Sequence, residues 1–174
     1  MNDNRGVSLE LLWYAVHVRS KHEFQVQERL HQTDVEVFLP VVEKLSKWKD
    51  RRKRITFPLF PGYLFVRIDR NSLEKPAVLK TKGVVRVLCT ESGEPEPVPD
   101  DQIASLRRLI DSGVPLDPHP YLKEGRRVRI RTGPLSGVEG ILVQRLGLHI
   151  LVLSVDILHQ GASLRIDASD VETI

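Results

Sequence analysis

The residues that most often do chemistry are few in this 174-residue sequence, and their spacing fits no reactive site. Its six histidines have no zinc-ligand spacing, and the one cysteine, Cys89, cannot complete a metal-binding set. The glycine-rich residues 133–140 lack the Gly-Lys-Ser/Thr ending of a phosphate loop. Asp100 and Asp101 are neighbours at an expected helix start, so their carboxylates do not face each other. The sequence therefore predicts a protein that is not an enzyme and that uses no metal and no cofactor.

Residues suited to binding are concentrated instead in residues 51–68, where a run of basic residues leads into two apolar strands. Pro61 and Gly62 suit a tight turn between these strands, because proline fixes φ and glycine accepts positive φ. Side chains alternate across a strand, so one face of the second strand holds Leu64, Val66 and Ile68, and the other holds Tyr63, Phe65 and Arg67. The aliphatic face is expected to be core. Two rings of the opposite face and a third ring before the turn form what we call the aromatic patch: Phe60, Tyr63 and Phe65.

The overall composition, with 41% hydrophobic and 28% charged residues, is that of a soluble globular protein. The formal net charge of +3 is compatible with nucleic acid nearby but too small to predict it alone. With Cys89 as the only cysteine, no internal disulfide can form, a reducing compartment is expected, and this side chain is predicted to be buried. The N-terminus has no signal-peptide character and no apolar run could span a bilayer, so we expect a cytoplasmic protein without membrane attachment.

The chain before the aromatic patch is predicted to form a strand, a helix and a second strand. Aromatic and β-branched residues at 13–18 indicate the first strand. Ser20 and Glu23 are spaced as in a capping box, so a helix is expected to follow them. The second strand is predicted over residues 35–42. The polar and strongly basic residues 43–54 are then expected to project as the distal part of a hairpin.

The second half of the chain predicts a helix, a linker and an all-β region. Asp100 is expected to cap the helix, whose inner face would hold Ile103, Leu106 and Ile110. Three prolines that follow are expected to exclude regular structure and to form a semi-rigid linker. Short, closely spaced strands after the linker indicate a small barrel. The predicted fold is an α/β (α+β) domain with an antiparallel sheet flanked by helices (residues 10–112), a linker (113–122) and a small all-β barrel (123–174).

A glycine pattern in the predicted barrel is the most specific motif of the chain. Gly133-Pro134 is expected to turn the chain, and Gly137 and Gly140 permit positive φ and close approach of strands. With Leu135 between them, these residues resemble the KOW motif of transcription elongation factors and ribosomal proteins. The resemblance implies an SH3-like barrel.

The first predicted domain resembles the N-terminal domain of the NusG family. The resemblance rests on Trp13-Tyr14 opening a strand, on a strand that ends near Pro40, and on the string Pro58-Leu59-Phe60-Pro61-Gly62-Tyr63-Leu64-Phe65-Val66. Domain order and the proline-containing linker also match, so the resemblance covers almost the whole chain. The string, and the absence of extra sequence between Val42 and Ile55, are closer to the specialised RfaH-like branch than to general NusG.

The resemblance implies a transcription elongation regulator that binds the clamp helices of RNA polymerase and promotes processivity or antitermination, on particular operons. The family's polymerase-binding positions fall on Tyr63 and Phe65, with Phe60 beside them. Two alternatives for these rings stay open: helices of the same domain bury them, or the second domain masks them until recruitment. Two alternatives for the function also stay open: a general NusG that couples polymerase to Rho or the ribosome, and a ribosome-associated KOW protein that binds RNA.

The resemblance also implies contact with the non-template DNA strand. The matching positions keep a basic or polar character suited to phosphate contact and base stacking; they are Arg19, Arg29, Thr81 and Lys82. RfaH-like members grip a second part of the polymerase with a His-Thr-Thr run. This sequence has Glu74-Lys75-Pro76 there, which leaves that grip unsupported.

Two further segments are candidate binding sites. Lys49, Arg51 and Arg52 lie in the basic hairpin, where they are expected to contact upstream DNA or nascent RNA unless they form a solvated tip. In the barrel, Ile157 and Leu158 match the positions through which NusG recruits Rho or the ribosomal protein NusE. The family's Gly-Arg pair that follows is absent, which weakens the case for Rho, and the alternative is that both residues belong to the barrel core.

Overall fold

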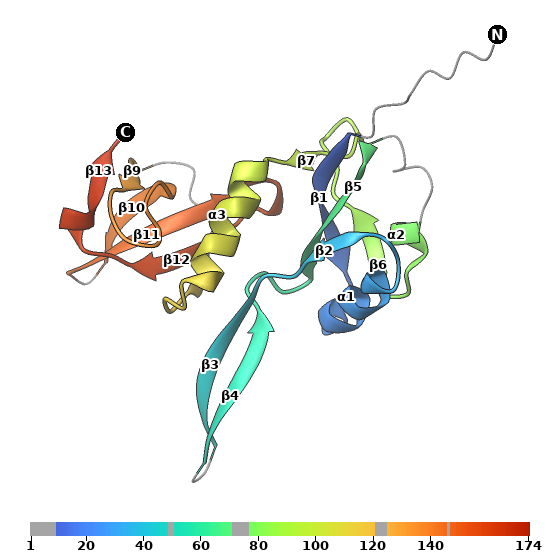
Figure 1. The fold of residues 1–174 in the computed structure, drawn as a ribbon, viewed down its shortest axis with the longest axis horizontal. Coiled ribbons are helices and arrows are strands. Elements are labelled where there is room, and N and C mark those ends of the chain that lie inside the picture. Colours follow the sequence, from blue (N-terminus) through green and yellow to red (C-terminus); the bar gives the residue numbers. More distant parts are fainter. Residues whose placement is uncertain (1–9, 49–50, 71–76, 121–124, 146) are drawn as a thin grey trace.

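An antiparallel sheet of five strands forms the first half of the structure (Figure 1). The computed structural model describes residues 10–48, 51–70, 77–120, 125–145 and 147–174. The sheet has the strand order β2-β5-β1-β6, and β7 pairs with β1 beside β6. Its strands are β1 (Leu11–Val18), β2 (Glu36–Phe38), β5 (Tyr63–Asp69), β6 (Val84–Val87) and β7 (Pro97–Val98). Its helices are α1 (Glu23–His31), α2 (Ala77–Lys80) and α3 (Asp100–Asp111).

The two faces of this sheet belong to two separate cores, as the alternation along residues 63–68 predicts. Leu64 and Val66 pack in a mainly aliphatic cluster with residues of α1 and α2. Phe65 packs in a second cluster with Trp13, on the face covered by α3. Strand β5 therefore divides its side chains as expected, with aliphatic residues on one side and rings on the other.

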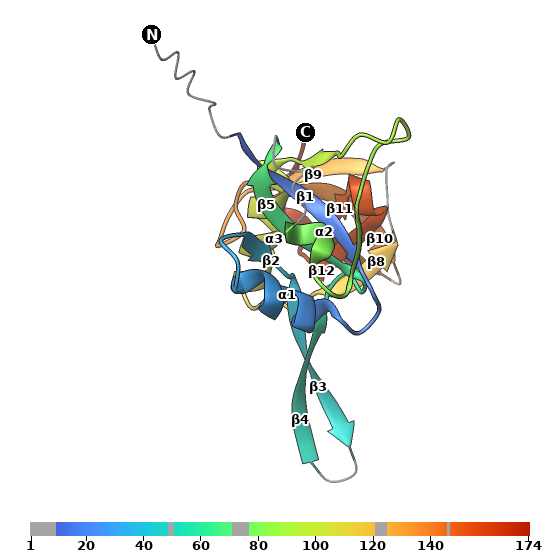
Figure 2. The same cartoon turned by 90° about the vertical axis from the view of Figure 1, so that its right-hand side faces the viewer.

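A hairpin of β3 (Val41–Trp48) and β4 (Arg51–Pro58) projects from the sheet (Figures 1 and 2). The predicted hairpin is thus confirmed. The single strand expected over residues 35–42 is instead split into β2 and β3, because Leu39 and Pro40 interrupt it where the chain leaves the sheet. Pro40 cannot donate a ladder hydrogen bond, which suits such a break.

A second antiparallel sheet of six strands forms the predicted small barrel. Its strand order is β13-β9-β10-β11-β12-β8. The KOW glycines act as predicted: Gly133 and Gly137 have φ of +78° and +86°, and Gly140 allows close approach of β11. The strands are β8 (Asp117–Pro120), β9 (Arg126–Ile130), β10 (Glu139–Arg145), β11 (Leu148–Val155), β12 (Gln160–Arg165) and β13 (Val171–Thr173), with 3-10 turns η2 (Asp156–Leu158) and η3 (Ala168–Asp170).

The proline-rich segment at residues 113–122 departs from the expectation that it excludes regular structure. Its residues 117–120 form β8, an edge strand that pairs with β12. Pro118 and Pro120 are two residues apart, so their nitrogens lie on the same side of the strand. An edge strand tolerates prolines that direct this missing donor away from its neighbour.

Three local expectations were wrong. Helix α1 starts at Glu23 with His22 as N-cap and without a side-chain cap, since Ser20 precedes a residue, Lys21, with φ of +64°. Helix α3 likewise has no side-chain cap, and its N-cap is Pro99 rather than an aspartate. Cys89 is exposed rather than buried, because it follows the end of β6 instead of lying inside a strand.

Candidate protein- and nucleic-acid-binding surfaces

The aromatic patch lies where β5 begins, on the sheet face that α3 covers. Phe65 and Phe60 are 0% and 1% exposed, whereas Tyr63 is half-buried. Phe65 stacks on Phe38 with 6.0 Å between ring centroids. Tyr63 instead contacts the ring of His17 on β1, at 5.3 Å between centroids. In this conformation the accessible part of the patch is therefore its Tyr63–His17 rim.

Helix α3 covers the neighbouring rings with an arginine. The Arg107 guanidinium lies 5.0 Å from the ring centroids of both Trp13 and Phe38. It also donates a 2.9 Å hydrogen bond to the Glu36 carboxylate. A planar guanidinium can stack on rings while its edge pairs with a carboxylate. The first domain's own helix thus accounts for part of the burial of the aromatic face.

The turn that presents Tyr63 is fixed from two sides. Gly62 has φ of +84°, and its N–H donates a 2.8 Å hydrogen bond to the buried carboxylate of Glu23 on α1. Its carbonyl accepts a 2.8 Å bond from the N–H of Val18, the last residue of β1. Glu23, predicted to cap its own helix, instead ties that helix to the turn. The sequence predicted the turn but carried no sign of this partner.

The four residues predicted to contact non-template DNA gather around Gly83. The N–H of Arg19 donates to the Gly83 carbonyl at 2.8 Å, and Arg29 donates to the Lys82 carbonyl at 2.5 Å. Thr81 donates its hydroxyl to the Ala77 carbonyl at 2.7 Å. We call these four residues, Arg19, Arg29, Thr81 and Lys82, the basic cluster.

Gly83 is what allows this close gathering. A Cβ there would lie 2.7 Å from a methyl carbon of Val26 on α1, closer than side chains tolerate. The loop can therefore approach α1 only with glycine at this position. Exposed Lys80 and Arg86, which no sequence motif singled out, flank the loop in the chain. The sequence marked these two residues only as charges beside an edge strand. That feature is too common to identify a binding site.

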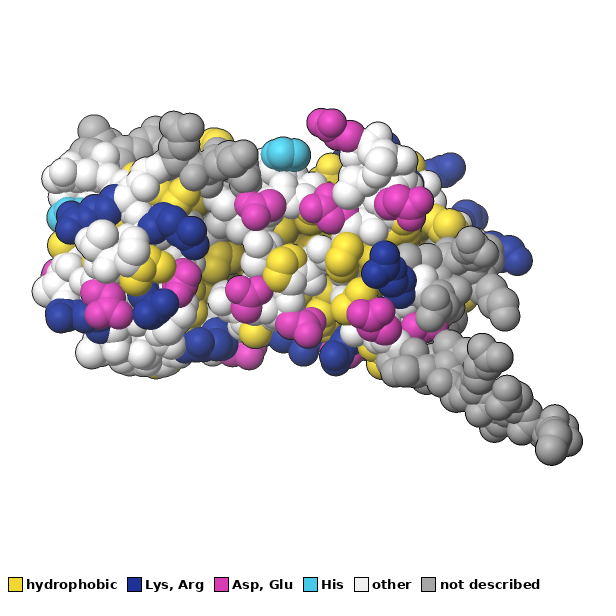
Figure 3. Space-filling view, turned by 90° about the horizontal axis from the view of Figure 1, so that it is seen from above, with side chains coloured by type: hydrophobic (Ala, Val, Ile, Leu, Met, Phe, Trp, Pro, Cys, Tyr) yellow, Lys and Arg dark blue, Asp and Glu magenta, His cyan; other side chains and the backbone are white. Residues whose placement is uncertain are grey.

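The basic hairpin lies at the same end of the molecule as α1 in both ribbon views (Figures 1 and 2). Arg51 and Arg52 pair in its ladder with Trp48 and Lys47, while Lys49 lies outside the described residues. Residues 74–76, the departure from the RfaH-like pattern, also lie outside them. On the face seen from above, Asp and Glu side chains spread over the middle of the molecule (Figure 3), so that face is unsuited to phosphate.

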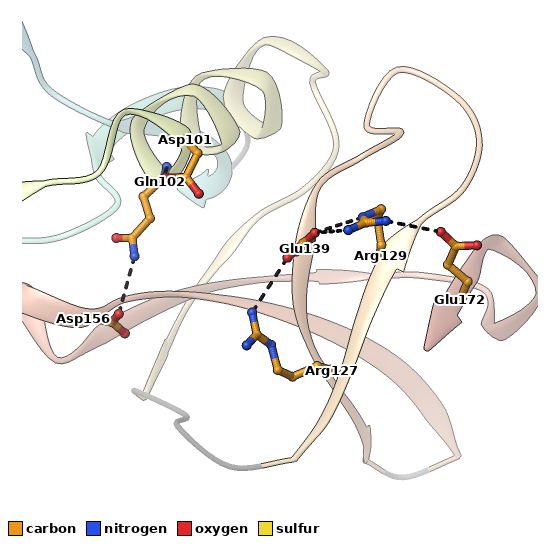
Figure 4. Close-up of polar contacts among 7 residues, drawn as sticks. All are labelled: Asp101, Gln102, Arg127, Arg129, Glu139, Asp156 and Glu172. Carbon is orange, nitrogen blue, oxygen red and sulfur yellow. Dashed lines mark hydrogen bonds and ion pairs between the residues drawn. The ribbon is translucent and has the colours of Figure 1, made fainter. Parts of the chain in front are cut away.

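The predicted partner residues of the barrel lie in the turn η2 rather than in a strand. Leu158 is buried, and Ile157 is half-buried against the same cluster that contains Phe65. Next to them, Asp156 accepts a hydrogen bond from Gln102 of α3 at 3.5 Å (Figure 4). This part of the barrel therefore lies against the first domain, and both residues contribute to the shared core.

A second contact joins the hairpin base to the barrel. The Lys44 ammonium forms a 2.7 Å ion pair with Asp117 of β8 and lies 5.3 Å from the ring centroid of Phe57. Both charged side chains are largely solvent-exposed, so this pair contributes little to stability, about 0–1 kcal/mol. The ion pair instead holds the hairpin in position, because it connects the hairpin base to strand β8 of the barrel.

Strands β9, β10 and β13 of the barrel carry a ladder of charge pairs (Figure 4). Glu139 on β10 accepts from Arg129 at 2.6 Å, and its other oxygen lies 3.8 Å from Arg127. Arg129 also lies 3.8 Å from Glu172 of β13. The hydrogen bond with Glu139, followed by its charge, raises the pKa of the Arg129 guanidinium. Because these charges neutralise one another across strands, this surface is a structural ladder rather than a phosphate site.

Within the described residues, no three His, Cys, Asp or Glu side chains lie together as a metal site would require. Among the same residues, no helix is long and apolar enough to cross a membrane. The structure thus defines a two-part protein with binding surfaces: an α/β part with a half-covered aromatic patch, a basic cluster and a protruding hairpin, and a small β-barrel.

This chain belongs to the NusG family. The family model described as "Transcription termination factor nusG" matches residues 11–107. The transcription termination/antitermination protein NusG of Pseudomonas aeruginosa is 26% identical over 140 residues, covering 75% of this chain and 79% of that protein. The protein of the same name from Buchnera aphidicola subsp. Baizongia pistaciae is 24% identical over 174 residues, covering 92% and 94%.

A solved structure shows the same fold across both parts. It is described as "Domain interaction in Thermotoga maritima NusG", with a TM-score of 0.55, 23% sequence identity, and coverage of 95% of this chain and 98% of that one. The predicted fold class and the family resemblance are thereby confirmed. The chain is a NusG-family transcription termination/antitermination factor, and it is not an enzyme.

Proposed function

We propose that this protein is an elongation regulator that binds the clamp helices of RNA polymerase and promotes processivity or antitermination on particular operons. The observation that carries the proposal is the aromatic face of β5, which points away from the aliphatic core and reaches the surface at Tyr63. Aromatic side chains with a polar tip are typical interface anchors. Residues 10–112 act as the polymerase-binding domain, and residues 123–174 act as the KOW domain that recruits a second partner such as NusE, the ribosome or Rho.

The buried rings fit a closed resting state. Phe60 and Phe65 lie in one continuous cluster with α3, with Leu116 of the connecting segment and with barrel residues such as Leu158. Polymerase would then bind only the minor, open conformation, in which the barrel has separated from the first domain. The apparent affinity for polymerase would depend on the fraction of molecules in that open conformation. The Thermotoga maritima structure, which is described by its domain interaction, supports a closed arrangement of this kind.

Replacing Tyr63 with alanine is expected to weaken retention of RNA polymerase about thirtyfold, since an aromatic anchor residue contributes about 2 kcal/mol or more. Retention on immobilised full-length protein measures this directly. Phe24→Ala is the control, because Phe24 is 44% exposed on α1, on the other face of the sheet. Equal retention by the Tyr63 variant and the wild type would contradict the proposed anchor.

The basic cluster is proposed to hold the non-template strand, and the hairpin residues Lys49, Arg51 and Arg52 are proposed to contact upstream DNA or nascent RNA. Arg19 and Lys82 are exposed beside the close approach at Gly83, so their cations are available to phosphates. The Arg29 guanidinium already donates a 2.5 Å hydrogen bond to the Lys82 carbonyl, so it also stabilises the conformation of this loop. Substitutions that test charge alone are therefore best made at Arg19 and Lys82.

The double change of Arg19 and Lys82 to alanine is expected to reduce affinity for single-stranded DNA and to lower the slope of log K against log salt by about 0.7 for each lost phosphate contact. Fluorescence anisotropy at a series of salt concentrations provides both values. Arg165→Ala, which removes an exposed cation from the barrel, serves as the control. An unchanged slope in the double variant would remove the basic cluster from the DNA-binding surface.

A general NusG role is the second candidate, because relatives named for termination and antitermination cover nearly the whole chain. The two candidates differ in what they do to Rho. In transcription with purified polymerase, a specialised antiterminator should suppress pausing at Rho-dependent sites, whereas a general factor should increase Rho-dependent release. That comparison, with and without Rho, decides between them.

A further inference from the structure

A row of three side chains crosses the first sheet at the open end of its aromatic face. His17 of β1 is the register partner of both Tyr63 on β5 and Arg86 on β6. Side chains of directly opposite residues lie on the same face of a sheet, with their Cβ atoms about 4.5–5.5 Å apart. Tyr63, His17 and Arg86 therefore form a continuous row over three strands, which we call the rim row.

A β-bulge in the edge strand β6 directs Arg86 to this face. The pairing of β1 with β6 shifts between His17 and Val18. Val84 and Val87 are three residues apart, which in a regular strand would place them on opposite faces. Because of the shift, both pack in the cluster that contains residues of α1, and Arg86 is left on the other face beside His17. Bulges often re-aim a side chain in this way.

The basic cluster lies on the α1 side of the sheet, away from the rim row. Arg29 belongs to α1, and a Cβ at Gly83 would lie 2.7 Å from Val26 of the same helix. Arg86 follows Lys82 by only four residues, yet it is directed to the opposite face. Its guanidinium is therefore separate from the proposed phosphate surface and belongs with the aromatic face.

Exposure rises along the rim row. Tyr63 and His17 are half-buried, and their rings are tilted by 32° with centroids 5.3 Å apart. Arg86 is exposed, and within the described residues its side chain forms no ion pair and no hydrogen bond. Arg67 and Arg107, by contrast, both pair with a carboxylate. The rim row thus offers ring surface that ends in a cation with no partner in the described part of the chain.

Ring surface that ends in a guanidinium selects a particular kind of partner. The rings suit an apolar side chain, and a guanidinium can donate two parallel hydrogen bonds to a carboxylate. Tyrosine and arginine are among the residues that most often supply binding energy at protein interfaces. Strands lie about 4.8 Å apart, so Tyr63 and Arg86 are separated by about 10 Å, or about two turns of a helix lying along the row.

We propose that Arg86 is a specificity-determining residue of the polymerase-binding surface, and that it pairs with a carboxylate on the clamp helices whose apolar side chains bind Tyr63 and His17. The inference rests on the proposed function, because it keeps the same partner and adds the charge that this partner must carry. The pair forms at the exposed edge of the contact. It therefore contributes mainly to the choice of partner and to the rate of association.

Charge reversal in the full-length protein tests the pair. Binding to RNA polymerase free of nucleic acid is measured by biolayer interferometry at low and at high salt. Arg86→Glu should weaken this binding about tenfold at low salt, because it removes an attraction and adds a repulsion. Arg86→Gln, which only removes the attraction, should weaken it about threefold. Both losses should shrink at high salt, where exposed charges are screened.

Lys80→Glu is the matched control, because it makes the same charge change at an exposed position of α2, on the α1 side of the sheet. This control should bind polymerase as the wild type does. Affinity for single-stranded DNA is measured in parallel by fluorescence anisotropy, and Arg86→Glu should change it no more than Lys80→Glu does. A larger loss of DNA affinity in Arg86→Glu would assign Arg86 to the nucleic-acid surface and overturn the proposal.

Charge exchange identifies the carboxylate on the polymerase. Each aspartate and glutamate of the clamp helices is changed to lysine in turn, and one of these polymerases should bind the Arg86→Glu protein more tightly than wild-type polymerase does. The proposal fails if none does, or if Arg86→Glu binds wild-type polymerase undiminished. A loss in Tyr63→Ala with none in Arg86→Glu overturns this inference alone, whereas no loss in Tyr63→Ala overturns the proposed anchor and this inference with it.

Discussion

Replacing Phe65 with alanine is expected to lower the free energy of unfolding by about 3–5 kcal/mol. Phe65 is 0% exposed, and its ring stacks on Phe38 at 6.0 Å in the cluster that continues into α3 and the barrel. Removing the ring leaves a cavity among fixed neighbours, and the strand cannot move to fill it because both of its edges are paired with β1 and β2. Urea denaturation followed by circular dichroism measures the loss.

Phe24→Ala is the matched control, because Phe24 is 44% exposed and its loss should change stability by no more than about 0.5 kcal/mol. A Phe65→Ala protein as stable as this control would show that the ring is not sealed in the folded state. The comparison also matters for polymerase binding. Lost retention in a Phe65 variant would reflect unfolding as well as a lost contact, and half-buried Tyr63 is for this reason the informative position.

Replacing Gly140 with alanine is expected to destabilise the barrel by about 3 kcal/mol, the upper end of the range for overpacking. A Cβ at this position would lie 2.6 Å from the carbonyl oxygen of Val152 and 3.1 Å from a side-chain carbon of Leu151. The first of these atoms belongs to the backbone of the paired strand β11, so it cannot rotate away. Hydrogen exchange of the β10 and β11 amides should accelerate first.

Gly147→Ala provides the comparison for Gly140. Gly147 has φ of +76°, and no atom lies within 4 Å of the point that a Cβ would occupy. Alanine there meets only left-handed backbone strain of about 1–2 kcal/mol. If Gly140→Ala costs no more than Gly147→Ala, close strand approach is not the reason for the glycine of the KOW pattern. The two substitutions separate crowding from backbone conformation within one barrel.

Local patterns in the sequence determined the elements that depend on neighbours along the chain. Alternation alone divided the side chains of β5 between two cores, as Leu64 and Phe65 show. The Gly133 and Gly137 positions predicted a turn because positive φ is a property of a single residue. The basic run between residues 43 and 54 likewise predicted a projecting hairpin, since so many charges cannot be buried together.

Tertiary structure decided which of these elements meet. Arg108 reaches the Pro134 carbonyl and Glu23 reaches the N–H of Gly62, yet neither pair leaves a periodic or local signal. The β8 strand depends on β12 as a partner. Sequence patterns report the conformation of a segment, whereas contacts between distant segments arise from the packing of whole elements. The partners of the aromatic patch in the closed chain were therefore visible only in the folded structure.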